Sequence, residues 1–396
     1  MERVVIVGGS VAGVTAVETL REDGFAGELV LINGENHAGY DRPPLSKHVL
    51  SGRMQCSDVA LRPLDFNLQH RVDHRLGVRA TGLDLDRRIV LLDGGEHVRF
   101  DALLIATGVR ARPLAGQPAW RGIHTLRTLD DALKLRTDLL NASRVVVVGA
   151  GFLGSEVAAT ARKLGLHVTL IDAFAVPMLR QLGREVGTAV LKTHGEHGVE
   201  MRACRMVRDF EERDGRVVGV TLDDGEHLAA DVVVVAIGAL PNTEWLVGSG
   251  IDADDGVVCD EYCRAANGVY AAGDVARWFH PGLGASLRIE HRMHATEQGM
   301  AAAKNLLGKQ VPFAPLPYFW TDFYDVKIQV FGRIAANDAM KVLAGEIGAS
   351  SFAAAYHRGG VITAVIGWNA SRKLRSLAPL VGERVDALAP ATISAA

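Results

Sequence analysis

Two glycine-rich turns, each followed by an acidic residue, carry the most specific chemistry in this sequence of 396 residues. The turns span residues 8–13 and 149–154, and each lies between a valine-rich run and an alanine-rich stretch. A second apolar run then leads to Glu35 or to Asp172. In such a turn the glycines allow a tight bend, backbone contact with a pyrophosphate and close packing of helix on strand, while the acid accepts a hydrogen bond from a ribose hydroxyl. The sequence therefore predicts two dinucleotide-binding βαβ units.

The two copies differ in their middle position and in what their acids imply. Ser10 replaces the middle glycine of the first copy, whereas the second has Gly151 there. Asp172 favours NADH over NADPH, because a carboxylate repels a 2′-phosphate and residues 173–177 contain no arginine. The alternatives are glycine turns of a parallel sheet without a ligand and a solvated loop aspartate. Two copies in the same context favour dinucleotide binding.

Further apolar runs that end in glycine lie at residues 103–108, 232–238 and 269–273. Continuous apolar runs of this kind are typical of strands buried on both faces. Because the second glycine turn lies between the first two runs, we expect one domain to be inserted into another. Alternation of apolar and polar residues at 326–331 predicts antiparallel strands near the end of the chain.

The predicted fold class is α/β, with two Rossmann-like dinucleotide-binding domains and an α+β C-terminal domain. The first domain is discontinuous and comprises residues 1–112 and 243–315. The second comprises residues 113–242, and the C-terminal domain comprises residues 316–396.

Composition and charge exclude several classes of function. Lysine and arginine number 43 against 46 acidic residues, a net charge of -3, which argues against a nucleic-acid partner. No apolar run approaches the roughly 20 residues that span a membrane, and the early apolar run at residues 4–7 leaves no room for a signal peptide. The four scattered cysteines predict no disulfide framework, so we expect a cytoplasmic protein.

No metal site is expected from the histidines. His70 and His74 are four residues apart and His291 and His294 three apart, but neither pair lies in an HExxH motif. Solvated or packed histidines are the better interpretation.

Seven further segments repeat the residues and the order of a known family. They are residues 40–47 (Tyr-Asp-Arg-Pro-Pro-Leu-Ser-Lys), 106–108, 126–131, 238–242, 273–274, 288–291 and 319–322. With the two turns, they resemble the oxygenase-coupled, NADH-dependent ferredoxin reductases, glutathione-reductase-like flavoproteins that include putidaredoxin reductase and biphenyl dioxygenase ferredoxin reductase. The resemblance extends from residue 4 to about residue 332 and implies FAD and NADH as cofactors.

The resemblance also implies roles for individual residues. Lys47 and Glu156 would flank the site of hydride transfer and orient the nicotinamide; the alternatives are a surface lysine and an acid near the start of a helix. The residues expected to bind FAD are Gly8, Ser10, Ala12, Gly13, Glu35, Arg42, Lys47, Ala106, Arg127, Gly273, Asp274, Glu290, Arg292 and Trp320. Those expected to bind NADH are Gly149, Gly151, Gly154, Glu156, Asp172 and Gly238. Arg292 stands where the family often has an aromatic residue.

The implied activity is electron transfer from NADH through FAD to a [2Fe-2S] ferredoxin that serves a cytochrome P450 or a Rieske-type oxygenase. Disulfide reductases of this superfold carry cysteines in the segment where residues 40–47 have none, so electrons must leave the flavin for an outside acceptor. The alternatives are a rubredoxin as acceptor, an NADH oxidase or quinone reductase, and a slow redox-sensing flavoprotein. Residues 277–294 contain Arg277, Arg288 and Arg292 with Glu290 as their only acid, which suggests a basic face for an acidic ferredoxin.

Overall fold

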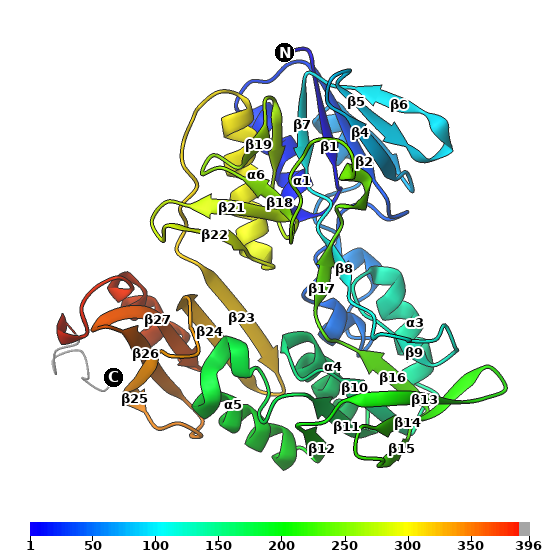
Figure 1. Cartoon of the computed structure of the whole chain (residues 1–396), viewed down its shortest axis with the longest axis vertical. Helices are drawn as coiled ribbons and strands as arrows, with labels where there is room; N and C mark the ends of the chain where they lie inside the picture. Colours follow the sequence, from blue (N-terminus) through cyan, green and yellow to red (C-terminus); the bar gives the residue numbers. More distant parts are fainter. Residues whose placement is uncertain (388–396) are drawn as a thin grey trace. The chain divides into compact units, whose positions relative to one another are not determined.

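Apolar, valine-rich strands such as Arg3–Val7 and Arg144–Val148 form the centres of two mainly parallel sheets, one in each of two units. The computed structural model describes residues 1–387 (Figure 1). The first unit comprises Met1–Pro43, Cys56–Arg110 and Ala239–Pro315, and the second comprises Pro44–Gln55, Ala111–Gly238 and the chain from Leu316 on. The chain changes unit after residues 110, 238 and 315, and also after residues 43 and 55, within the predicted first domain. The predicted domain bounds stay a prediction. The last nine residues of the predicted C-terminal domain, 388–396, lie outside the described residues.

The first unit is built on a six-stranded sheet in the order β19-β20-β7-β1-β2-β3. Its strands are β1 (Arg3–Val7), β2 (Glu28–Asn33), β3 (Val72–Leu76), β7 (Ala102–Ile105), β19 (Arg264–Ala266) and β20 (Val269–Ala271). All neighbours are parallel except β19 and β20. Because parallel strands place their carboxyl ends on one edge, the segments that follow β1, β7 and β20 converge there.

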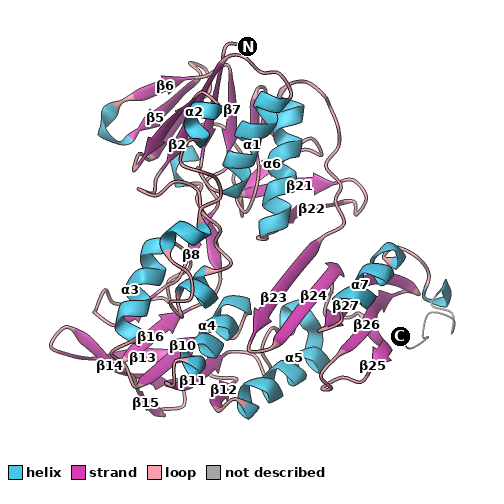
Figure 2. Cartoon of the chain, turned by 180° about the vertical axis from the view of Figure 1, so that it is seen from behind, coloured by secondary structure: helices cyan, strands magenta, loops and turns pink. Residues whose placement is uncertain are grey.

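Helices α1 (Val11–Glu22) and α6 (Arg292–Leu306) lie side by side against this sheet (Figure 2). Smaller elements complete the first unit: β4 (Ala80–Asp84), β5 (Ile89–Leu92) and β6 (His97–Arg99) in one sheet, β18 (Val257–Cys259), β21 (Ala276–His280) and β22 (Ala285–Arg288) in another, the paired β8 (Val109–Ala111) and β17 (Ala239–Pro241), and α2 (Phe66–Gln69). Apolar side chains from the sheets and from both long helices form one continuous core.

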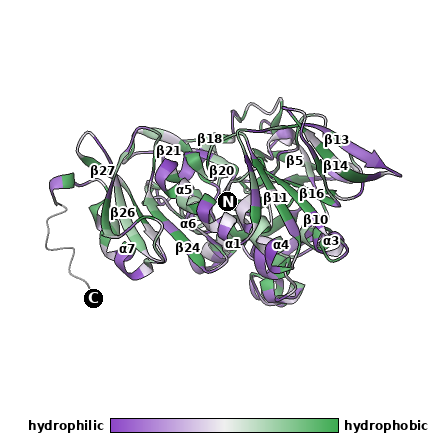
Figure 3. Cartoon of the chain, turned by 90° about the horizontal axis from the view of Figure 1, so that it is seen from below, coloured by the Kyte–Doolittle hydropathy of each residue, from purple (hydrophilic) through white to green (hydrophobic). Residues whose placement is uncertain are grey.

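The second unit contains a five-stranded parallel sheet in the order β12-β11-β10-β16-β9. Its strands are β9 (Ile123–His124), β10 (Arg144–Val148), β11 (His167–Asp172), β12 (Val199–Ala203) and β16 (Val232–Val235). Helices α3 (Leu129–Leu139), α4 (Phe152–Lys163) and α5 (Leu179–Glu196) connect the strands from β9 to β12 in chain order. The connection from β12 to β16 contains a separate sheet of β13 (Val207–Arg213), β14 (Arg216–Leu222) and β15 (His227–Ala229). In Figure 3 the strands β10, β11 and β16 are hydrophobic, whereas the tip of the β13–β14 hairpin is hydrophilic.

A five-stranded antiparallel sheet in the order β23-β24-β27-β26-β25 also belongs to the second unit. Its strands are β23 (Tyr318–Phe323), β24 (Val326–Gly332), β25 (Ala339–Gly345), β26 (Phe352–Arg358) and β27 (Val361–Trp368), followed by α7 (Ser371–Leu377). The alternation at residues 326–331 thus lies in an antiparallel strand, as predicted. Leu182 of α5 accepts a hydrogen bond from the buried Tyr356 hydroxyl, and side chains of α5 share a core with this sheet.

Among residues 1–387, no helix combines the length and the apolar character needed to cross a membrane.

Candidate functional site

The first glycine turn leaves no room for side chains at its two ends. Gly8 has a φ of +122°, and a Cβ there would lie 2.0 Å from the carbonyl oxygen of Ala106. A Cβ on Gly13 would lie 1.9 Å from the carbonyl oxygen of Gly8. These approaches bring Gly8, Gly13 and Ala106 together at the carboxyl ends of β1 and β7, as a tight strand–turn–helix crossing requires.

The turn leads into a helix whose first N–H groups no side chain caps. Ser10 is the N-cap residue of α1, but its hydroxyl makes no capping hydrogen bond, and the first helical turn contains no acid. Such a terminus suits the phosphates of a dinucleotide. Gly273, at the end of β20, lies close to Ala12, where an added Cβ would be 3.1 Å from that of Ala12. Its N–H donates to the buried Gln298 side chain of α6 at 2.9 Å.

Glu35 is held by two neighbours beyond the end of β2. The Tyr40 hydroxyl donates to one carboxylate oxygen at 2.5 Å and Arg42 Nη2 to the other at 2.7 Å. Burial alone would lower the pKa of Arg42, but its neighbours Tyr40 and Glu35, with a contribution from Asp274, raise it above its usual value. The structure therefore groups Glu35, Arg42 and Asp274 in the first unit.

Arg292, the residue that departs from the family pattern, opens α6 and forms an ion pair. Its Nε lies 3.0 Å from the carboxylate of Asp41. Without this partner a cation at a helix N-terminus would be unfavourable. The preceding Glu290 pairs with Arg288 at 2.6 Å. All four residues belong to the first unit.

The second glycine turn repeats the close approaches of the first and adds an open position. A Cβ on Gly149, where φ is +102°, would lie 2.4 Å from the Ala236 carbonyl oxygen, and one on Gly154 would lie 1.8 Å from that of Gly149. A Cβ on Gly151 would meet nothing within 4 Å. Gly151 is the N-cap residue of α4, and no side chain caps this terminus. Gly238 has a φ of +111° and likewise faces open space. The free space at Gly151 is where a pyrophosphate would approach the backbone.

Asp172 ends β11 and binds backbone on both sides. One carboxylate oxygen accepts the Ala150 N–H of the glycine turn at 2.5 Å, and the other accepts the Phe174 N–H at 2.8 Å. The carboxylate is thus oriented at the edge of the parallel sheet, next to the turn. Each oxygen retains a lone pair for one further donor.

Lys47 and Glu156 form a partly buried ion pair in the second unit. Lys47 follows Leu45 and Ser46 in a short helical turn, Leu45–Val49, and Glu156 lies on α4 with 8% of its surface exposed. The Lys47 ammonium is 3.0 Å from Glu156 Oε1 and 3.0 Å from Asp322 Oδ1. Burial would lower the pKa of Lys47, but the charges of Glu156 and Asp322 outweigh it and raise that pKa. Lys47 therefore acts as a fixed positive charge.

Two hydroxyl groups complete the shell of the Glu156 carboxylate. Ser46 Oγ donates to Oε2 at 2.5 Å, and Thr321 Oγ1 donates to Oε1 at 2.8 Å. The Thr160 hydroxyl of α4 in turn donates to the Ser46 carbonyl oxygen at 2.7 Å. Sequence reasoning missed Ser46, Thr321 and Asp322, although the segments 40–47 and 319–322 already contained them. A polar pair inside the otherwise aromatic β23 was the available signal.

Arg127 and Trp320, two further predicted FAD residues, also lie in the second unit. The Arg127 N–H donates to Asp131 Oδ2 at 3.0 Å, just before the capping box in which Thr128 and Asp131 start α3. The Trp320 ring stacks on Tyr318 with centroids 5.9 Å apart, and the side chain is half-buried. Their contacts to FAD stay a prediction.

The arginines at residues 277–294 do not form an unopposed basic face. Arg277 lies 3.2 Å from the carboxylate of Asp254, and Arg288 lies 3.2 Å from that of Asp255. These acids come from the loop before β18, which the local sequence count did not include. Acids from outside the stretch thus partly neutralise the expected basic face, and its role in binding an acidic ferredoxin stays a prediction.

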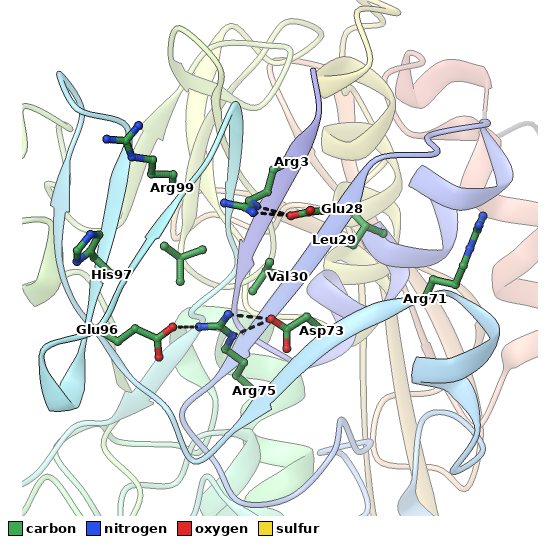
Figure 4. A pocket seen from close by; sticks show the side chains of 11 residues that line it. Arg3, Glu28, Leu29, Val30, Arg71, Asp73, Arg75, Glu96, His97 and Arg99 are labelled. Carbon is green, nitrogen blue, oxygen red and sulfur yellow. Dashed lines mark hydrogen bonds and ion pairs between the residues drawn. The ribbon is translucent and has the colours of Figure 1, made fainter.

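A groove of 540 Å³ in the first unit is lined by residues of β1, β2, β3 and β6 (Figure 4). Arg3 and Glu28, at the amino ends of β1 and β2, pair across it at 2.6 Å. Arg75 lies between Asp73 and Glu96, at 2.8 and 2.6 Å. Dinucleotides bind at the carboxyl ends of parallel strands, and these charges largely neutralise one another, so the groove is not a candidate dinucleotide site.

The four cysteines are free thiols, with Cys56 and Cys204 exposed and Cys259 and Cys263 buried. Burial raises the pKa of Cys263 to about 12, so this thiol is unreactive. In the part of the chain that the structure describes, no three His, Cys, Asp or Glu side chains form a group that could hold a metal ion.

Comparison with known proteins identifies the family that shares these features. The family model described as pyridine nucleotide-disulphide oxidoreductase matches residues 2–299, and the reductase C-terminal model matches residues 318–395. The chain belongs to the pyridine nucleotide-disulphide oxidoreductase family. The predicted α/β fold class and the recognition of the family are confirmed.

Relatives in this family match nearly the whole chain. The ferredoxin reductase component of chlorobenzene dioxygenase from Cupriavidus sp. is 37% identical over 99% of this chain and 95% of its own length. Putidaredoxin reductase from Pseudomonas putida is 33% identical over 92% of this chain and 88% of its own. Rhodocoxin reductase from Rhodococcus erythropolis is 38% identical over 85% of this chain and 79% of its own.

Two solved structures of family members superpose closely on this chain. The covalent putidaredoxin reductase–putidaredoxin complex gives a TM-score of 0.92 with 32% identity over 97% of this chain and 93% of that one. The ferredoxin reductase for the CYP199A2 system from Rhodopseudomonas palustris gives a TM-score of 0.94 with 30% identity over 100% of this chain and 98% of that one.

Proposed function

We propose that this oxidoreductase transfers electrons from NADH through FAD to a [2Fe-2S] ferredoxin, which then serves a cytochrome P450 or a Rieske-type oxygenase. The observation that carries the proposal is the presence of two dinucleotide-binding turns in one chain, each with close glycine contacts that a side chain would block. One turn serves a bound flavin nucleotide and the other a nicotinamide nucleotide. The names of the relatives, several of them ferredoxin reductase components, support this assignment.

The first unit fits FAD. Gly8, Ser10, Ala12 and Gly13 surround the uncapped start of α1, which would hold the pyrophosphate. Glu35 would bind the adenosine ribose, and Arg42 the phosphates or the flavin. FAD, when bound, accepts two electrons as a hydride and releases them one at a time, which matches a two-electron donor to a one-electron iron–sulfur acceptor.

The other predicted FAD residues would act around the same cofactor. Asp274, at the end of the segment that follows β20, would bind the ribityl chain. Arg292, Glu290 and the start of α6 would lie at the flavin edge that becomes negative on reduction, where a helix N-terminus is favourable. Ala106 and Gly273 would complete the environment in the first unit, and the FAD contacts expected of Lys47, Arg127 and Trp320, which belong to the second unit, stay predictions.

In the second unit Gly149, Gly151, Gly154 and Gly238 would hold NADH, with Asp172 on its ribose. Glu156 would accept from the nicotinamide carboxamide, because its carboxylate is fixed by Ser46 and Thr321. Lys47 balances the charge of Glu156 and stays protonated, so it orients and screens rather than donates a proton.

The two electrons and the proton of the hydride leave the enzyme separately. Two ferredoxins take one electron each, and the proton goes to solvent. Within residues 1–387 all four cysteines are unpaired thiols, so no internal disulfide accepts these electrons. The free thiols are consistent with a reducing compartment, and we propose the cytoplasm.

Anaerobic stopped-flow spectroscopy tests the proposal. The FAD-loaded protein is mixed with NADH or NADPH, and a [2Fe-2S] ferredoxin is then added while both chromophores are followed. We expect fast bleaching of the flavin by NADH and subsequent reduction of ferredoxin. Bleaching followed by reduction of oxygen or quinone but not of ferredoxin would contradict the proposed acceptor, and a protein that binds no flavin would contradict the whole assignment.

A further inference from the structure

Asp322 is the more exposed of the two carboxylates that share Lys47. It lies near the end of β23, 3.0 Å from the Lys47 ammonium, and 41% of its side chain is exposed. No other ion pair or hydrogen bond joins its side chain to any of residues 1–387. Lys327 lies opposite Asp322 in the register of β23 and β24, but this lysine is exposed and forms no ion pair with it. Lys47 is therefore the cation that holds the Asp322 carboxylate.

Lys47, Glu156 and Asp322 together carry one net negative charge. Lys47 is the only cation of these three residues, and its raised pKa keeps it protonated. Its charge offsets that of one carboxylate, so the charge of the other remains. The side chains of Lys47 and Glu156 are only 15% and 10% exposed. Water and salt screen charges at such a place much less than on an open surface.

We propose that Asp322 gives the nicotinamide site a net negative charge, which favours the positively charged ring of NAD+ over the neutral ring of NADH. This inference rests on the proposed function, since it takes Glu156 as a neighbour of the nicotinamide. In the proposed reaction NADH gives up a hydride to FAD. A ring C–H bond breaks, both of its electrons leave with the hydrogen, and the ring is left with a positive charge.

A negative group that is already in place stabilises this positive charge as it develops. Without Asp322, the charges of Lys47 and Glu156 would cancel, and the site would not distinguish the two rings by their charge. Asp322 acts through the charge balance at Lys47 and takes no part in the transfer of the hydride. It is therefore a positioning residue.

The preference for NAD+ makes bound NADH a stronger reductant. Binding of the two forms and their redox equilibrium belong to one thermodynamic cycle, so the potential of the bound nucleotide falls when the oxidised form binds more tightly. For a two-electron couple, a tenfold preference corresponds to about 30 mV.

Binding of two dinucleotides that differ in the charge of the ring tests the inference without turnover. NAD+ and tetrahydronicotinamide adenine dinucleotide, a neutral analogue of NADH that donates no hydride, are titrated by calorimetry into the oxidised, FAD-loaded protein at low salt. The measured quantity is the affinity for NAD+ divided by that for the analogue. Both ligands carry the same adenosine and pyrophosphate, so the contribution of the glycine turn cancels in this ratio.

Three variants separate the charge of Asp322 from its shape. Asp322→Asn keeps the shape of the side chain and removes its charge, whereas Asp322→Glu keeps the charge. Glu346→Gln is the matched control, because Glu346 is an exposed acid that follows β25, the opposite edge strand of the same sheet. We expect Asp322→Asn to lower the ratio about tenfold. Asp322→Glu and Glu346→Gln should leave the ratio unchanged.

Lys47→Met changes the charge in the opposite direction and should raise the ratio. Because Asp322 is more exposed than Lys47, Asp322→Asn keeps the inference testable if Lys47→Met fails to fold.

Two results would overturn the inference. If Asp322→Asn leaves the ratio unchanged, even though both ligands bind more weakly, Asp322 does not act through its charge. If Asp322→Glu lowers the ratio as much as Asp322→Asn does, the shape of the side chain sets the preference. A wild-type protein that binds neither ligand would instead contradict the proposed function, because the second unit would then not hold a nicotinamide nucleotide.

Discussion

The ammonium of Lys47 lies 3.0 Å from the carboxylate of Glu156. Lys47 and Glu156 come from different elements, since 110 residues separate Ser46, the neighbour of Lys47, from Glu156. Asp322 lies at the same distance from the ammonium on another side. One cation thus serves two carboxylates, one of which is nearly fully buried.

Lys47→Met should leave Glu156 as an unpaired buried charge. We expect the free energy of unfolding to fall by about 3 kcal/mol and flavin reduction by NADH to slow about tenfold to a hundredfold. Asp322→Asn should cost at most about 1 kcal/mol, because Asp322 is 41% exposed. Urea titration and stopped-flow absorbance measure the two effects. Equal losses for both variants would show that burial of the pair does not determine its strength.

The hydroxyls of Ser46 and Thr321 should act through Glu156. Ser46→Ala and Thr321→Val each remove one donor to the carboxylate, and we expect a loss of about 1–2 kcal/mol of stability for each. NADH oxidation should slow in both variants. A larger change in kcat would show that the orientation of the nicotinamide is affected, and a larger change in KM would show that its binding is affected. In a Glu156→Gln background the losses of stability caused by Ser46→Ala and Thr321→Val should be smaller, since the effects of substitutions at interacting residues are not additive. Full additivity would mean that the hydroxyls act independently of Glu156.

Two glycines of the second turn should differ when changed to alanine. At Gly151 a Cβ meets only open space, so Gly151→Ala should fold with unchanged stability but fill the room for the pyrophosphate. A clash worth about 1–3 kcal/mol would weaken NADH binding about tenfold to a hundredfold. At Gly154 the Cβ would lie 1.8 Å from a carbonyl oxygen, and we expect destabilisation of about 3 kcal/mol or more. Tight NADH binding by Gly151→Ala would contradict the assigned position of the pyrophosphate.

His294 should make the stability of the first unit depend on pH. Burial, with a smaller contribution from His291, lowers its pKa from 6.5 to about 4, while the unfolded chain titrates near the ordinary value. Its folded form is neutral and packs on Trp278 with ring centres 4.6 Å apart. The unfolded state therefore binds the extra proton between pH 6.5 and 4, so stability is complete above this window and falls as the pH decreases through it.

The expected loss through His294 is about 3 kcal/mol between pH 7 and pH 4. Urea titrations at several pH values should show a shallower decline for His294→Gln than for the wild type. The exposed His167 offers a matched control, and His167→Gln should follow the wild-type curve. Parallel curves for His294→Gln and the wild type would mean that His294 is not the responsible group.

Asp254 and Asp255 should limit the attraction of an acidic ferredoxin, because they pair with Arg277 and Arg288. Changing both acids to asparagine should accelerate ferredoxin reduction at low salt about threefold or more, with no difference at high salt. Asp209 and Asp224 pair with arginines of the second unit, and their asparagine variants are the control. No acceleration at low salt would place the docking surface elsewhere.

The sequence by itself determined the two βαβ units, because glycines at fixed spacing have a local cause. Gly8 and Gly149 need positive φ angles and close backbone contacts, and any chain that builds these turns must place glycine there. The buried valine strands and the alternating strand β24 likewise follow from periodicity. The family resemblance added the pairing of Lys47 with Glu156.

Only the tertiary structure decided which polar groups meet. Ser46, Thr321 and Asp322 reach the Lys47–Glu156 pair from segments far apart in sequence. Thr321 and Asp322 stand out as a polar pair in an aromatic strand, but that local pattern does not say which groups they meet. Asp254 and Asp255 partly neutralise a basic stretch that looked unopposed. Charges act through space over a few ångströms, whereas sequence patterns record only neighbours along the chain, so the electrostatics of the site emerge only on folding.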